Sequence, residues 1–111
     1  MGELDSVNSW VELQSKVKGS LGGWMTADER ERLFQIAKSM QSGQRFLEIG
    51  VYGGTTLSMF ALMAPDSVEV IGVDDWSNET PNKSIVTGQP VDLRTFCLEN
   101  LELNGVRDQV R

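Results

Sequence analysis

The residues best suited to bind a charged ligand lie close together, at positions 45–56 of the sequence. This stretch reads RFLEIGVYGGTT, so an apolar run with an acid near its end, Glu48, leads into a loop rich in glycine. Glycine lets the backbone approach a ligand closely, and the free N–H groups of a following helix favour a negatively charged ligand group. The stretch therefore predicts a strand, a glycine loop and a helix that together bind a nucleotide-type cofactor.

Spacing separates three kinds of glycine loop. A phosphate-binding P-loop needs a lysine after its second glycine, but this region reads GGTT, so that interpretation fails. A dinucleotide fingerprint, G-x-G-x-x-G, has Tyr52 at the place of the second glycine after Gly50, which weakens that alternative without excluding it. The pattern E-x-G-x-x-x-G-x-[ST] is matched in full by Glu48, Gly50, Gly54 and Thr56.

A second acidic position follows the next apolar run. Residues 68–73 read VEVIGV, which predicts a strand, and Asp74 and Asp75 come directly after it. Asp74 follows Gly50 at close to the roughly 20-residue separation expected between a glycine loop and a ribose-binding acid. A carboxylate at the end of a strand can accept hydrogen bonds from both ribose hydroxyls. The alternative is that the two acids only solvate a turn.

At these residues the chain resembles the class I S-adenosylmethionine-dependent methyltransferases. EIGVYGGTT is similar to the first motif of the small catechol-type O-methyltransferases. WMTADER, FLEIGVYGGTT and VIGVDDW together resemble the family 24 methyltransferases, which act on sugars and small natural products. The resemblance covers residues 24–111 and is most specific over 46–76. It implies S-adenosylmethionine as the cofactor, and methyl transfer to an oxygen of a small-molecule acceptor.

The resemblance also implies roles for single residues. Thr56 would offer its hydroxyl and N–H to the methionine carboxylate, and Glu48 would either lie near the amino group or hold the loop. Tyr52 either lines the methionine end or packs under the loop, and Trp76 either stacks on adenine or anchors the segment after it. Thr55 and Thr56 are expected to cap the helix. The predicted cofactor-binding residues are Glu48, Gly50, Tyr52, Gly54, Thr55, Thr56, Asp74, Asp75 and Trp76.

No catalytic residue and no metal ligand is predicted in this sequence. A general base, or a metal that acidifies a hydroxyl, is expected after a fourth strand. Cys97 is the one cysteine, and because the chain has no histidine to activate it, packing is the favoured role. Two rival functions remain open, a nicotinamide-dependent oxidoreductase and a non-catalytic truncated domain.

Two segments are expected, a helical extension over residues 1–44 and a partial Rossmann-like domain over 45–111. A first helix should end before the glycine-rich positions 19–23, and a second should begin at a Thr26–Glu29 capping box and end by Gly43. Such helices either form a lid over the cofactor or pack as an extension that covers the sheet. One face of the first helix is expected to carry Val7, Trp10, Val11 and Val17.

The second segment predicts a β-α-β-α unit, the first half of a Rossmann-like parallel sheet in the α/β class. Its expected elements are a strand at 45–51, a helix at 55–64, a strand at 68–73, a long polar loop at 77–90 and a helix at 92–104. In the family that the chain resembles, a third strand would begin near Val110 and Arg111. The sequence is therefore expected to be truncated before that strand, as a fragment of a longer enzyme.

Composition sets the outer limits. The 111 residues allow one small domain, and the net charge of −6 with no Lys/Arg cluster argues against a nucleic-acid partner. No apolar run approaches the ~20 residues of a membrane helix, so no membrane partner is expected. A lone cysteine suits a reducing compartment, which favours a cytoplasmic location. Homo-oligomer formation is left open.

Overall fold

The computed structural model of the chain describes residues 7–18, 25–77 and 82–111. The first helix was expected to end before positions 19–23, and it ends at Gln14. The helices are α1 (Trp10–Gln14), α2 (Ala27–Ser39), α3 (Thr55–Met63) and α4 (Leu93–Leu103), with a 3₁₀ turn, η2 (Arg107–Gln109). The strands are β1 (Arg45–Ile49), β2 (Glu69–Val73), β3 (Asn82–Lys83) and β4 (Pro90–Val91).

The main sheet is parallel, as predicted. Strands β1 and β2 pair from Arg45 opposite Glu69 to Ile49 opposite Val73, and α3 connects them. The chain then returns to the free side of β2, where Val110 forms a parallel bridge with Val70. Two backbone hydrogen bonds extend this pairing, from Arg111 N to Val70 O (2.9 Å) and from Gly72 N to Arg111 O (2.8 Å). The last residues thus enter the sheet where the third strand was expected to begin.

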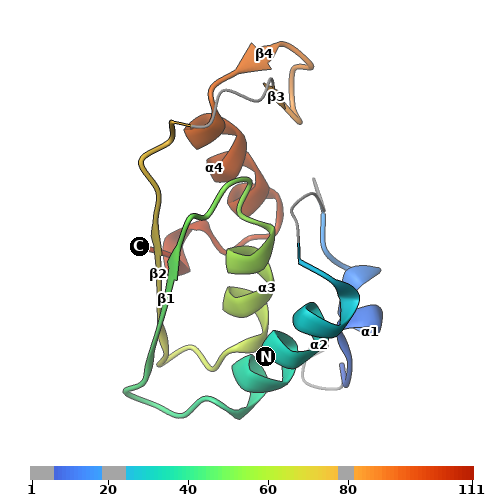
Figure 1. Cartoon of the computed structure of the whole chain (residues 1–111), viewed down its shortest axis with the longest axis vertical. Helices are drawn as coiled ribbons and strands as arrows, with labels where there is room; N and C mark the ends of the chain where they lie inside the picture. The colour runs from blue at the N-terminus through green and yellow to red at the C-terminus, as the bar shows by residue number, and fades with distance from the viewer. Residues whose placement is uncertain (1–6, 19–24, 78–81) are drawn as a thin grey trace.

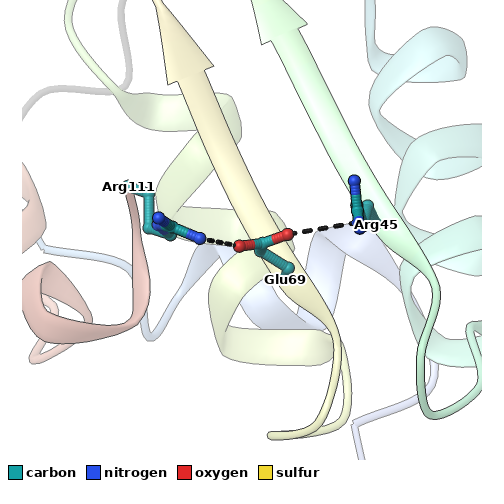
Figure 2. A network of polar contacts seen from close by, with 3 residues as sticks. All are labelled: Arg45, Glu69 and Arg111. Carbon is teal, nitrogen blue, oxygen red and sulfur yellow. Dashed lines mark hydrogen bonds and ion pairs between the residues drawn. The ribbon is translucent and has the colours of Figure 1, made fainter.

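Helices cover one face of this sheet (Figure 1). Phe46 of β1 stacks on Phe60 of α3 with ring centroids 3.6 Å apart, and α2 packs on the same helix. Successive side chains of a strand point to opposite faces, so Leu47 and Ile49 project away from α3, and both are exposed. On this other face, Glu69 pairs with Arg45 (3.3 Å) and with Arg111 (Figure 2). The sheet therefore has one face that is packed against helices and one face that is exposed to solvent.

The N-terminal helices share the hydrophobic core with α3. Trp10 and Leu13 of α1 are fully buried, whereas Val11 is 72% exposed, so the expected placement of Val11 on the buried face is wrong. On an α-helix the residue three positions after Trp10 shares its face, and the next residue does not. The backbone N–H of Trp10 donates to Glu31 Oε1 of α2 (2.8 Å).

The expected boundaries hold to within a few residues. The capping box of α2 is confirmed, since Thr26 Oγ1 accepts from Glu29 N and Glu29 Oε1 accepts from Thr26 N. This helix ends at Ser39, earlier than the expected Gly43. The last helix, expected at 92–104, spans Leu93–Leu103, and Asp92 is its N-cap residue. The segment expected to be a plain polar loop contains an antiparallel pair, β3 with β4.

Candidate functional site

The glycine loop, residues 50–54, connects the end of β1 to the start of α3. Gly50, Tyr52 and Gly54 all have positive φ, at 84°, 54° and 84°. Gly50 N donates to Val73 O (2.8 Å), which fixes the beginning of the loop to the end of β2. A positive φ is unusual for tyrosine, and such a conformation persists only where its surroundings hold it. The conformation of the loop therefore depends on the contacts that surround it.

Asp74 is the residue that holds Tyr52. Its Oδ2 accepts a hydrogen bond from Tyr52 N (3.0 Å), and its Oδ1 accepts one from Trp76 N (2.7 Å). Trp76 is the other non-glycine residue with positive φ, at 60°. One carboxylate thus ties the glycine loop to the turn after β2. Because each carboxylate oxygen can accept more than one hydrogen bond, a ribose hydroxyl can still bind beside these two.

Glu48 lies on β1 with its carboxyl group turned towards the packed side of the sheet. Its Oε1 is buried and has no hydrogen-bond partner among the residues that the structure describes. Burial, and secondarily the nearby charge of Asp74, raises the pKa of Glu48 to about 7. A buried acceptor without a partner is costly, so this oxygen is suited to a donor or a cation supplied by a ligand.

The start of α3 has no side-chain cap. The N-cap residue is Gly54, which has no side chain to accept a hydrogen bond from the first turn. The expectation that Thr55 and Thr56 cap this helix is therefore wrong. Both threonines lie inside the first turn, where Thr55 is buried and the Thr56 hydroxyl donates to Met25 Sδ at 3.4 Å. A thioether is a weak acceptor, so a carboxylate could take that hydroxyl over.

The remaining predicted residues surround the loop less closely. Asp75 is exposed and accepts from both the N–H and the hydroxyl of Ser77, which lowers the pKa of its carboxyl group. This is the turn-solvating role that the sequence left open. Trp76 is partly buried against the hydrophobic core, in agreement with the anchoring alternative.

Helix α4 forms the floor of the loop, and sequence reasoning missed its polar member. Asn100 is buried and its Nδ2 donates to Gly53 O (2.6 Å). The signal that could have found it is its spacing, because Asn100 shares a helical face with Phe96 and Cys97 of the predicted apolar pattern. Burial raises the pKa of the Cys97 thiol to about 12, in line with a packing role.

Within residues 7–18, 25–77 and 82–111, no three or more His, Cys, Asp or Glu residues are grouped so that they could hold a metal ion. In the same ranges, no helix has the length and apolar character required to cross a membrane.

No family model and no curated protein matches the sequence. Solved structures do match. TomG, an O-methyltransferase of tomaymycin synthesis from Streptomyces achromogenes solved with S-adenosylmethionine, has 19% identity and a TM-score of 0.54 over 79% of this chain and 33% of its own. A protein from Klebsiella pneumoniae assigned as an O-methyltransferase has 19% identity and a TM-score of 0.56 over 89% and 37%. Cofactor-bound Rv0187 from MTB has 20% identity and a TM-score of 0.54 over 91% and 39%.

These likenesses define the fold. The described residues share the α/β fold of part of these solved structures. The chain spans between a third and two fifths of the length of the structures it matches.

Proposed function

We propose that this chain forms the cofactor-binding part of a class I S-adenosylmethionine-dependent methyltransferase. The observation that carries the proposal is the combination of charges around the glycine loop. The unpartnered Glu48 carboxyl group and Asp74 interact with each other at the ends of β1 and β2, and the loop leads into the uncapped start of α3. A ligand that suits all three features carries cationic groups, a carboxylate and hydroxyls on one molecule.

S-adenosylmethionine meets this description, and a dinucleotide meets it less well. Its carboxylate suits the N–H groups at the start of α3, where Thr55 and Thr56 lie. Its ammonium suits Glu48, and its ribose hydroxyls suit Asp74. A pyrophosphate at the same loop would meet two acidic side chains, Glu48 and Asp74, which counts against the nicotinamide alternative.

In this proposal the chain binds and orients the methyl donor. The cofactor supplies an activated methyl group, and holding it in line with an acceptor oxygen is catalysis by proximity and orientation. Gly50 lets the backbone come close to the ligand, Gly54 lets the loop pack on Cys97 of α4, and Tyr52 and Trp76 flank the ligand. Asp75 contributes by shaping the turn after β2 rather than by direct contact.

The proposal extends to the molecule that accepts the methyl group. We place the chain nearest to the family 24 and catechol-type enzymes, with a small molecule or a sugar as the acceptor. A cytoplasmic location and homo-oligomer formation are proposed on the sequence alone.

Isothermal titration calorimetry with S-adenosylhomocysteine and with NADH tests the proposal. The parent chain is expected to bind the first and not the second. Asp74→Ala should weaken binding by ~1.5–3 kcal/mol, because it removes charged acceptors and releases the Tyr52 N–H that donates to Asp74. Asp75→Ala is the matched control and should bind as the parent does. Preference for NADH, or equal affinities for the Asp74→Ala and Asp75→Ala chains, would contradict the proposal.

A further inference from the structure

Asn100 is the one buried asparagine among the described residues, and its amide points at the cofactor loop. Its side chain is 1% exposed, and Nδ2 donates to Gly53 O at 2.6 Å. This hydrogen bond joins α4 to a loop 47 residues earlier in the chain. A buried polar side chain in an apolar helix face needs such a partner, but an apolar residue would fill the same space without one.

The carbonyl group that accepts from Asn100 belongs to the peptide that leads into α3. It joins Gly53 to Gly54, and Gly54, with φ of +84°, leads directly into the first turn of α3. A peptide is planar, so fixing the carbonyl of Gly53 also fixes the direction of the Gly54 N–H. That N–H donates to Val51 O at 3.3 Å, which is long for a hydrogen bond and so restrains the peptide weakly.

Packing from α4 supports the same peptide from below. A β-carbon at Gly53 would lie 3.0 Å from Phe96 Cε2, and one at Gly54 would lie 2.8 Å from Cys97 Sγ. The loop therefore lies in close contact with α4, and Asn100 is the residue of this helix that adds a direction to the contact. Van der Waals contact sets a distance, whereas a hydrogen bond also sets an orientation.

We propose that Asn100 is a positioning residue of the cofactor site. Its amide orients the peptide between Gly53 and Gly54, and through it the N–H groups at the start of α3 that would receive the ligand carboxylate. This inference rests on the proposed function. It assigns Asn100 no contact with the cofactor itself.

The same helix offers a matched control one turn later. Asn104 also bonds to a distant backbone, since its Nδ2 donates to Lys18 O (2.9 Å) and its Oδ1 accepts from Lys18 N (2.8 Å). Within α4 its Nδ2 also donates to the backbone Asn100 O (2.8 Å), and this bond does not involve the side chain of Asn100 that binds Gly53. It has the same side chain and lies in the same element, but it holds the N-terminal segment instead of the glycine loop. Loss of Asn104 therefore reports what a purely structural asparagine contributes.

The experiment compares Asn100→Ala, Asn100→Leu and Asn104→Ala with the parent in the 111-residue chain. Asn100→Leu keeps the buried volume and so guards against a failure of Asn100→Ala to fold. The readouts are the carbonyl ¹³C shift of Gly53, amide exchange at residues 52–55, and the affinity for S-adenosylhomocysteine under conditions where each variant is folded. The first two readouts need no ligand.

Both Asn100 variants are expected to move the Gly53 carbonyl resonance upfield, to speed loop exchange and to weaken binding about tenfold. Asn104→Ala should change none of the three. If Asn100 and Asn104 variants show equal shifts and affinities, the positioning role is overturned. If the parent binds no S-adenosylhomocysteine, the proposed function fails, while the carbonyl shift and exchange still show whether Asn100 orients the loop.

Discussion

Glu48 combines three properties that rarely occur together in one carboxyl group. It is largely buried, one of its oxygens has no partner, and its pKa is raised from an ordinary 4.5 to about 7 by burial and then by Asp74. Such a group has either a functional partner that is absent from the free protein or a proton of its own near neutral pH. Both states have consequences that can be measured.

The first consequence is a pH dependence of stability. Between about pH 4.5 and pH 7 the folded chain keeps the Glu48 proton that the unfolded chain has already lost. The folded state then binds more protons, so the free energy of unfolding should fall as the pH rises through this window and level off above it. After allowance for partial exposure, the fall should be about 2 kcal/mol.

Urea unfolding of the parent and of Glu48→Gln from pH 5 to pH 8 measures this slope. The variant should lose the slope. Asp75→Asn is the control, because the pKa of Asp75 is lowered and the group titrates below the window. Parallel curves for the parent and Glu48→Gln would show that Glu48 is not the group responsible.

Residue type and spacing were sufficient to find both acids of the site, but not to say how they are used. Asp74 was recognised because an acid follows a predicted strand at a suitable distance from Gly50. Its bonds to the N–H groups of Tyr52 and Trp76 depend on positive φ at those two residues. Neither residue type favours that conformation, so only the tertiary structure shows it.

At the scale of elements, order and type were predictable because strong local signals agreed. The capping box of α2 and the Asp92 cap of α4 are direct hydrogen bonds between neighbours in sequence. Placement was harder where several faces of an element are apolar. Val11 and Leu13 have similar hydrophobicity in a five-residue helix, and only the packing of α1 on α2 decides which is buried.

The hairpin of β3 and β4 shows what local reasoning lacks. Glu99 of α4 accepts from Ser84 Oγ (2.6 Å) and from Ile85 N (2.9 Å), and these partners lie 15 and 14 residues away along the sequence rather than next to it. Ser84 Oγ in turn accepts from Val86 N and Thr87 N. In Figure 1 the hairpin lies against α4 at the end of the molecule towards which β1 and β2 run.

Removal of this anchor should loosen the hairpin without unfolding the domain. Glu99→Ala leaves the buried Ser84 hydroxyl and the Ile85 N–H without their acceptor, which should cost about 1–3 kcal/mol. Hydrogen exchange at residues 84–89 should accelerate, while exchange in α3 stays as in the parent. Glu102→Ala is the control on the same helix, since its pairing with Arg107 is long, at 3.8 Å, and exposed. Equal exchange in the two variants would show that Glu99 does not anchor the hairpin.

At the scale of the whole molecule, the sheet has one packed and one bare face. Parallel sheets are normally covered on both faces, yet Leu47, Ile49 and Val73 are exposed on the side away from α3. Beside them, Arg45, Glu69 and Arg111 form a charged row across neighbouring strands (Figure 2). Exposed ion pairs of this kind add little stability, so they do not offset the exposure of the apolar side chains on this face.

An exposed apolar sheet face with a free strand edge is a surface on which chains associate. We therefore expect the 111-residue chain to self-associate with rising concentration. Ile49→Lys, at a side chain that is 78% exposed, should shift the chain towards monomer in sedimentation velocity experiments, because a charge is costly to bury between two faces. Val11→Lys is the matched control, since Val11 is similarly exposed at 72% but lies on α1. If both variants associate as the parent does, the contact lies elsewhere. If the parent is monomeric throughout, the bare face alone is insufficient to drive association.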